Sequence, residues 1–299
     1  MNNFIYSNTK YLQYILQINI RFMKNILLLL LTVSTIFCKS QKKANEINVL
    51  FIGNSFTYFH DMPQTVQKMV NETNPNIKIE QSTFPGQTLS GHLSEIITSR
   101  TENGINTRIK EPGETTETEK KIAEKQWDVI ILQTGTIAVL IPEDRDLNEN
   151  KAIAAIKKLV SNPNCKFILF NTWASKDRGY PKQYCFPSYI IDESIQKEKC
   201  CSPVLKSLEN EVETINEAYR LVAKENNLIK SDNGTKFFEI LTKYPEIELY
   251  EDESHPNKYG SFLNACIFYQ LLTDNKASDL KYNGEIEPKI SEILKKVAE

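Results

Sequence analysis

Four short stretches rich in apolar residues recur along the chain and predict the strands of one sheet. They span residues 47–52, 77–83, 128–132 and 167–170; the second alternates apolar and polar positions, and the other three are continuous apolar runs apart from Asn48 and Asp128. Continuous apolar runs are typical of strands that are covered on both faces. The pattern therefore predicts a sheet buried between two layers.

Helical spacing of apolar residues occurs between and after these strands. Asp61 is a plausible cap for the first predicted helix, and Asn162-Pro163 is a stop for the fourth. The predicted helices span residues 63–73, 89–99, 118–126, 148–161, 204–226 and 258–272. Because strands that alternate with helices form βαβ units with right-handed crossovers, we expect a doubly wound parallel sheet.

One long segment, from Ser175 to Pro203, departs from this alternation. Long irregular segments in compact domains are usually functional or disordered, and we expect this one, an insertion at about 175–203, to form a lid or a substrate-side wall. It also contains Cys185, Cys200 and Cys201, and we expect one disulfide across it, with the partner of Cys185 left open. Two further cysteines outside it, at positions 165 and 266, are interpreted as small core residues.

The length and charge of the chain limit what it can bind. A chain of 299 residues suffices for one sizeable α/β domain, which we place at residues 44–299. Its 36 basic and 38 acidic residues nearly balance, so no basic stripe is available for phosphates. We therefore expect no nucleic acid partner.

Residues 1–43 are interpreted as an N-terminal extension with a signal peptide. A lysine-led apolar run at 24–37 has the charged and apolar regions of such a signal, and it is too short to span a bilayer. We expect an exported protein, periplasmic or secreted, without a membrane-spanning segment. A start at Met23 is an open alternative, as are cleavage after Ser40 and a lipid anchor at Cys38, although Phe37 stands where a lipidated cysteine is normally preceded by a small residue.

The motif FIGNSFT, residues 51–57, places a serine directly after the first predicted strand. In parallel sheets, ligands bind beyond the carboxyl ends of the strands, which is where Ser55 stands. Gly53 permits a sharp turn, and the following helix start offers N–H groups to a negative charge. The alternative is an ordinary turn-and-cap pair formed by Asn54 and Ser55.

A second motif, YEDESHPNKYG at residues 250–260, supplies the partners that a serine nucleophile needs. A serine hydroxyl needs a base, and a histidine base needs a carboxylate that fixes its tautomer. Asp252 and His255 can supply both from one turn closed by Pro256.

Together the two motifs resemble the SGNH (GDSL-like) hydrolase superfamily of esterases and deacetylases, and within it an exported Bacteroidetes-type branch with an IGNSFT first block. The resemblance covers residues 47 to about 280. It implies a three-layer α/β/α sandwich with a flavodoxin-like parallel sheet. It also implies Ser55 as nucleophile, His255 as general base and Asp252 as orienting acid, with Asn54 where many relatives have Asp.

The resemblance also implies an oxyanion hole, in which this chain departs from the pattern. The Ser55 N–H would be one donor, and the second block, FPGQTLSGHL, assigns another to the N–H of Gly86. The third block, G-x-N-D in most relatives, is replaced by DVIILQTGTIAV. One alignment puts Ile137 at the Asn position, where it cannot donate; the other, which we prefer, puts Gln133 there.

Three other residues near these motifs have structural alternatives. His60 is interpreted as a surface or capping residue, and His92 as structural, with a place in the cleft as its alternative. Trp173 ends the fourth strand and either stacks on a sugar ring or caps the core. Asn54 and Trp173 are our weaker candidates for substrate binding.

These observations predict an exported serine esterase that needs no metal or other cofactor. The most plausible substrate is an O-acetyl group on a carbohydrate, so the expected partner is a small-molecule or glycan ester. An O-acyltransferase with the same three residues and a catalytically inactive glycan-binding homologue remain open alternatives. The second is motivated by the missing G-x-N-D block.

Overall fold

The computed structural model describes residues 46–101 and 104–299. The chain divides into residues 1–46 and a compact unit, Ile47–Glu299, to which everything below refers. The expected signal peptide and the Cys38 anchor lie outside the described residues. In the described part of the chain, no helix combines the length and the apolar character needed to cross a membrane.

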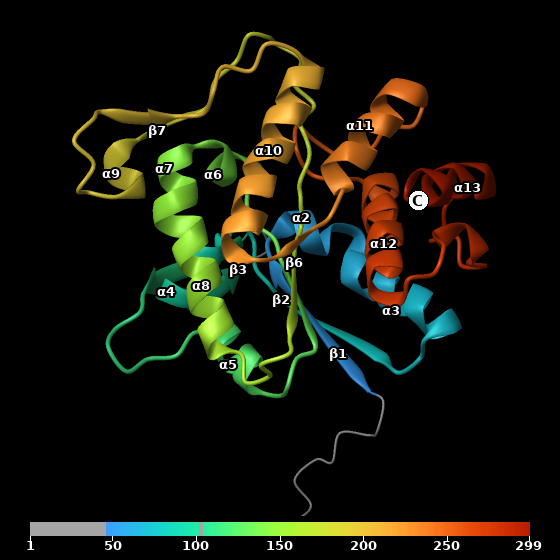
Figure 1. Cartoon of the computed structure of the whole chain (residues 1–299), viewed down its shortest axis with the longest axis horizontal. Helices are drawn as coiled ribbons and strands as arrows, with labels where there is room; N and C mark the ends of the chain where they lie inside the picture. The colour runs from blue at the N-terminus through green and yellow to red at the C-terminus, as the bar shows by residue number, and fades with distance from the viewer. Residues whose placement is uncertain (1–45, 102–103) are drawn as a thin grey trace, which may run out of the picture. The chain divides into compact units, whose positions relative to one another are not determined.

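A five-stranded parallel sheet forms the centre of the unit, with strand order β2-β1-β5-β6-β9 (Figure 1). Its strands are β1 (Ile47–Gly53), β2 (Ile77–Thr83), β5 (Val129–Leu132), β6 (Lys166–Leu169) and β9 (Ile229–Lys230). This order confirms the predicted flavodoxin-like sheet. The order reverses beside β1, which places a ligand crevice at the carboxyl end of that strand.

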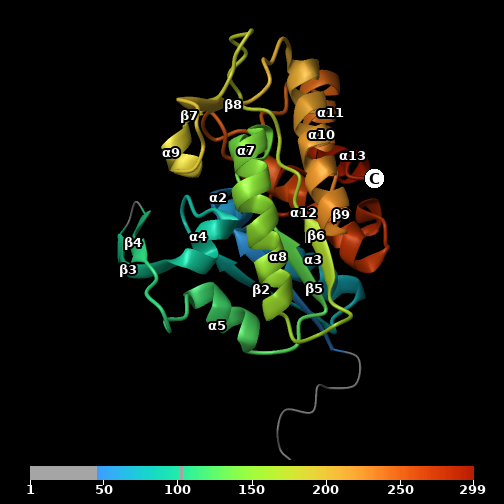
Figure 2. The ribbon, with the colours of Figure 1, turned by 60° about the vertical axis from the view of Figure 1, so that its left-hand side comes forward.

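Two layers of helices cover the sheet, because β1 sends side chains to both faces. Val49 and Phe51 pack into one core cluster, and Leu50 and Ile52 pack into the other. The first core is closed by α3 (Met62–Thr73), α11 (Asn233–Lys243), α12 (Lys258–Thr273) and α13 (Pro288–Val297), and the second by α4 (Leu89–Ser94), α5 (Glu117–Ala123), α8 (Asn150–Leu159) and α10 (Leu208–Asn226). The views in Figures 1 and 2 show α8 and α10 on one side and α3 and α12 on the other. The predicted three-layer sandwich is confirmed.

Two local predictions were wrong. The helix expected at 89–99 ends at Ser94, and the chain continues as β3 (Glu95–Thr101), which pairs antiparallel with β4 (Gly104–Ile109). The run Ile96-Ile97-Thr98 explains this, because β-branched side chains favour strands. Asp61 precedes α3 with a left-handed φ of 52° and makes no capping hydrogen bond through its side chain.

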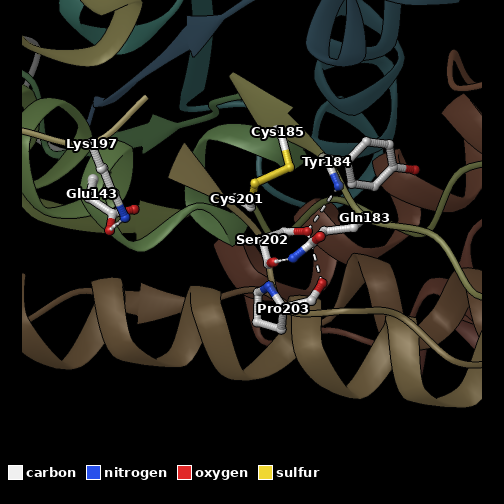
Figure 3. The surroundings of a disulfide bond; sticks show 8 residues. All are labelled: Glu143, Gln183, Tyr184, Cys185, Lys197, Cys201, Ser202 and Pro203. Carbon is white, nitrogen blue, oxygen red and sulfur yellow. Dashed lines mark hydrogen bonds and ion pairs between the residues drawn. A yellow bond between two sulfur atoms is a disulfide. The ribbon is translucent and has the colours of Figure 1, made fainter. Parts of the chain in front are cut away.

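Short elements connect these layers. They are α2 (Ser55–Tyr58), η1 (Phe59–Asp61), α6 (Thr136–Leu140), α7 (Pro142–Asp144), the π-helical turn η2 (Arg145–Glu149), β7 (Cys185–Pro187), α9 (Ser188–Ile191), β8 (Lys199–Cys201) and η3 (Ala277–Asp279). Strands β7 and β8 pair antiparallel within the insertion. Figure 3 shows that a disulfide joins Cys185 to Cys201 across this pair, which selects between the two partners left open above. Cys200 is a free, buried thiol.

Glu149 is a buried acid whose ionisation should affect stability. Its side chain is 1% exposed, and its Oε2 has no hydrogen-bond partner within the described residues. Burial, with a smaller contribution from the charge of Asp144, raises the pKa of Glu149 from 4.5 to about 8. The folded protein therefore keeps a proton that the unfolded chain releases, so this group lowers the free energy of unfolding as pH rises from about 5 to 8.

Glu149→Gln should raise the melting temperature relative to the wild type, and the difference should grow between pH 5 and pH 8. The amide has a similar shape and stays neutral, so it avoids the cost of burying an acid that is ionised when unfolded. Thermal unfolding of both proteins across this pH range measures the difference. A difference that is constant with pH would contradict the assignment.

Candidate active site

The serine motif folds as a strand, a sharp turn and one short helix. Strand β1 ends at Gly53, and Asn54 caps α2 by accepting a hydrogen bond from the Phe56 N–H at 3.1 Å. Ser55 is therefore the first residue of α2 and stands at the carboxyl end of β1, beside the crevice that the strand order creates. Asn54 is therefore the helix cap of this turn. The Ser55 hydroxyl is not used for capping and stays available as a nucleophile.

The two sequence motifs meet at this serine. Ser55 Oγ lies 2.8 Å from His255 Nε2, and His255 Nδ1 lies 2.6 Å from Asp252 Oδ2. The three side chains thus form one hydrogen-bonded chain, although Ser55 and His255 are 200 residues apart. With Nδ1 donating to the carboxylate, Nε2 is the acceptor that can take the serine proton.

The loop that contains Asp252 holds its carboxylate ionised and correctly oriented. Asp252 Oδ1 accepts hydrogen bonds from the N–H groups of Ser254 and His255, both at 2.8 Å. Although partial desolvation raises the pKa of Asp252, these N–H groups and the imidazole outweigh it and lower that pKa to about 2. The carboxylate is therefore charged at any pH at which an esterase would be assayed.

Aromatic rings fix the plane of the imidazole. The Phe59 ring stacks on His255 with centroids 4.3 Å apart and an angle of 8° between the planes. The Phe56 ring meets the same imidazole edge-on at 5.5 Å. Phe56 belongs to the serine motif and Phe59 follows it by two residues, so one short segment supplies the nucleophile and orients its base. We did not assign these residues from the sequence, although they stand within four residues of Ser55.

Gln133 lies under the nucleophile turn and is fully buried. Its Oε1 accepts hydrogen bonds from the Asn54 N–H at 2.8 Å and the Thr57 hydroxyl at 2.9 Å, and its Nε2 donates to the Thr134 carbonyl at 2.8 Å. These contacts position the turn; they are not the contacts of the oxyanion donor that the sequence suggested. Thr57 is a further residue that we did not assign from the sequence.

Gly53→Ala should disrupt this support. A Cβ at Gly53 would lie 2.6 Å from both Gln133 Oε1 and Thr57 Oγ1, so the turn that carries Ser55 must shift. We expect ester hydrolysis to fall at least tenfold and the free energy of unfolding to fall by about 1–3 kcal/mol. Gly104→Ala is the matched control, because a Cβ there meets no atom within 4 Å. Equal activity of the two variants would contradict the role given to this turn.

The turn that contains Gly86 is the other candidate part of an oxyanion hole. Gly86 has a φ of 67°, and the Gln87 N–H donates to the Phe84 carbonyl at 3.2 Å, which closes a tight turn. Asn54 Nδ2 donates to the Gln87 carbonyl at 3.0 Å and ties this turn to the nucleophile. In the described part of the chain, neither the Ser55 N–H nor the Gly86 N–H has a hydrogen-bond partner.

The two weaker candidates have mainly structural contacts. Asn54 is 8% exposed and uses both ends of its amide within the protein. Trp173 is 3% exposed and stacks on Phe237 with centroids 4.0 Å apart. Its Nε1 donates to the Ser254 carbonyl at 3.0 Å, one residue before His255. These contacts fit the alternative in which Trp173 caps the core. Through its hydrogen bond to Ser254, Trp173 also supports the loop that contains His255.

The other two histidines lie outside the hydrogen-bonded chain. His60 forms an exposed ion pair with Glu251 at 2.5 Å. His92 is buried, with Nε2 2.9 Å from the Gly53 carbonyl and Nδ1 2.6 Å from Thr118 Oγ1. Burial lowers the pKa of His92 to about 4, so it is a neutral structural residue. Within the described residues, no group of three or more His, Cys, Asp or Glu side chains could hold a metal ion.

Two solved structures resemble this fold. A DUF4886 family protein from Bacteroides uniformis is 17% identical, with 85% of this chain and 93% of that chain covered and a TM-score of 0.62. A candidate SGNH hydrolase from Slackia heliotrinireducens is also 17% identical, with 76% of this chain and 100% of that chain covered and a TM-score of 0.51. No protein-family model and no curated protein matches the chain. At such identities the likeness is one of fold.

Proposed function

We propose that this chain, which has the fold of SGNH hydrolases, is a serine hydrolase that cleaves carboxylic esters through an acyl-enzyme on Ser55. The observation that supports this most is the hydrogen-bonded chain from Ser55 through His255 to Asp252. A bound ester carbonyl would be attacked by Ser55 Oγ while His255 Nε2 takes the proton. The imidazolium would return that proton to the leaving alcohol, and water would release the acid by the reverse sequence.

The developing oxyanion would be held by backbone donors. The N–H groups of Ser55 and Gly86 are the two we assign, because neither has a partner among the described residues and their turns are joined through Asn54. Gln133 would act as a positioning residue that holds the Asn54 N–H and Thr57. Loss of a single oxyanion donor typically lowers turnover by about 10²–10³-fold, so the backbone geometry of these turns matters greatly.

Two observations favour hydrolysis over the alternatives, an acyltransferase and an inactive binding module. The side chains of His255 and Asp252 are 27% and 53% exposed, which lets water reach the base and favours hydrolysis over acyl transfer. The hydrogen bond at Ser55 favours a working nucleophile over an inactive binding module. Export remains a proposal based on residues 24–37, and an acetylated carbohydrate remains one based on the family resemblance.

Hydrolysis of a small aryl acetate tests the proposal. The wild type should release the phenol well above background, and Ser55→Ala should not. Ser94→Ala, at an exposed serine outside the hydrogen-bonded chain, controls for the loss of a hydroxyl. Equal background rates for wild type and Ser55→Ala would reject the enzyme and leave the binding-module alternative.

A further inference from the structure

A cavity of about 200 Å³ opens beside the hydrogen-bonded chain; we call it the side pocket. Its lining includes Phe56 and Ser254, the residues that follow Ser55 and precede His255. The Phe56 ring lies 5.5 Å from the His255 ring and 5.4 Å from the Trp173 ring, so the pocket begins where the proposed reaction occurs. The segments after β5 and β6 contribute most of the other lining residues, and α10 contributes Glu211.

The walls of the side pocket are mainly apolar. Phe56, Ile137 and Trp173 contribute hydrocarbon surface. Ile137 is the residue that stands at the Asn position in one alignment of the third block, where its side chain cannot donate a hydrogen bond. Apolar walls of this kind stabilise a hydrocarbon group by removing it from water.

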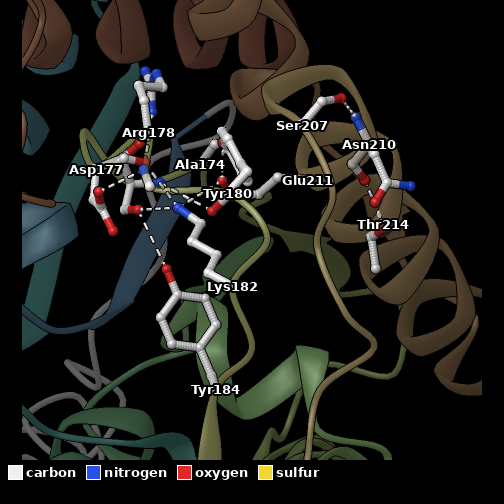
Figure 4. A network of polar contacts seen from close by, with 12 residues as sticks. Ala174, Asp177, Arg178, Tyr180, Lys182, Tyr184, Ser207, Asn210, Glu211 and Thr214 are labelled. Carbon is white, nitrogen blue, oxygen red and sulfur yellow. Dashed lines mark hydrogen bonds and ion pairs between the residues drawn. The ribbon is translucent and has the colours of Figure 1, made fainter.

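The polar side chains of the side pocket are largely paired with other groups of the protein. Glu211 accepts hydrogen bonds from the Tyr180 hydroxyl at 2.5 Å and from Lys182 Nζ at 2.8 Å. Lys182 Nζ also donates to Ser175 Oγ at 2.8 Å, and that oxygen lies 3.3 Å from the Tyr184 hydroxyl. Figure 4 shows Lys182, Tyr184 and Glu211 of this network. The Glu211 and Lys182 side chains are 1% and 10% exposed. This network fixes the insertion against α10.

The paired network argues against a sugar as the occupant of the side pocket. A sugar hydroxyl that enters the pocket must find hydrogen-bond partners, and groups already paired would have to give up existing bonds. Thr136 is likewise engaged, with its Oγ1 2.7 Å from Thr172 Oγ1. A hydrocarbon chain needs no hydrogen-bond partners, and its burial against the apolar walls is favourable.

We infer that the side pocket binds an aliphatic chain of about four to six carbons carried by the substrate ester. A water-sized group needs about 30 Å³ in the liquid and a methylene group is similar, so the cavity has room for about six such groups. This is more than the methyl of an acetyl group occupies. The inference rests on the proposed function, and the chain could belong to the acyl group or to the alcohol.

Two ester series that share ethyl acetate separate these sources. One lengthens the acid (ethyl butyrate and ethyl hexanoate), and the other lengthens the alcohol (butyl acetate and hexyl acetate). Acid release at constant pH gives kcat/KM for each ester. In the series whose chain enters the pocket, kcat/KM should rise by about fourfold per methylene, the transfer preference of a buried methylene group.

Two variants of Ile137 test whether the side pocket causes this preference. Ile137→Trp should fill the pocket and lower kcat/KM for the six-carbon ester at least tenfold relative to ethyl acetate. Ile137→Ala should enlarge the pocket and retain the preference for the longer chain. Leu159→Trp, at an exposed position at the end of α8, is the matched control and should behave as the wild type.

The outcomes distinguish this inference from the proposed function. A chain-length preference in either series that Ile137→Trp removes supports the inference and identifies the source of the chain. Cleavage of ethyl acetate with no preference in either series, or with a preference that Ile137→Trp leaves intact, overturns the inference and leaves the esterase standing. A wild type that cleaves none of the esters overturns both.

Discussion

Replacing His255 with alanine should lower kcat for a small ester by about 10⁴- to 10⁶-fold, because the serine loses the base that takes its proton. Asp252→Asn should cost less, about 10²- to 10⁴-fold. The Asp252 side chain is 53% exposed, so water can partly replace it in orienting the imidazole. Steady-state hydrolysis of one aryl acetate by all variants measures these effects.

His60→Ala is the control for the loss of an imidazole near the same loop. Its exposed ion pair with Glu251 is worth at most about 1 kcal/mol, so we expect no more than about a fivefold change in kcat.

The double variant Ser55→Ala/His255→Ala should be no slower than either single variant, since residues that act as a unit are not additive. A double variant much slower than both would show that the two residues act separately.

Trp173→Ala should lower the free energy of unfolding by about 3–5 kcal/mol, because the ring is buried and stacked on Phe237. Trp173→Phe keeps a ring but removes the hydrogen bond to the Ser254 carbonyl. We expect about 1 kcal/mol of lost stability for this variant, and about a tenfold fall in kcat as the loop that contains His255 loosens. Chemical denaturation and ester hydrolysis measure the two effects.

Trp127→Phe is the matched control for this hydrogen bond. Trp127 is also fully buried, and its Nε1 donates to the Ile122 carbonyl at 3.1 Å, in the core on the other face of the sheet. It should lose similar stability and retain kcat. If both Phe variants lose kcat equally, Trp173 acts through general stability and does not position His255.

The parts of the fold that the sequence predicted are those with a strong local pattern. The four consecutive β1 residues that pack into the two cores, 49–52, are all apolar, and β2 was predicted with its observed bounds, 77–83. Strand β9 could not be recognised, because it is two residues long and its first residue is exposed. Helix α11 was also missed; it begins with Asn233 and Gly234, which are poor helix formers, and the close packing of Gly234 against the Thr172 carbonyl, which leaves no room for a Cβ, is a tertiary contact that the sequence does not show.

The candidate site likewise contains residues that local motifs predict and a residue whose role depends on tertiary contacts. Ser55 follows directly from a strand end, and Asp252 and His255 share one short loop, so local motifs were enough to select them. Gln133 was selected as an oxyanion donor because an amide can donate; the sequence did not show that its carbonyl oxygen would be needed by Asn54 and Thr57. An amide has a donor and an acceptor end, and only the three-dimensional arrangement shows which partners each end binds.

Covalent trapping tests most directly whether Ser55 is an activated nucleophile. The wild type is incubated with an alkyl fluorophosphonate. Intact-mass analysis and peptide mapping should then find one adduct, on Ser55. The adduct should be absent from Ser55→Ala and form far more slowly in His255→Ala. A wild type that remains unlabelled, or is labelled at another residue, would contradict the account.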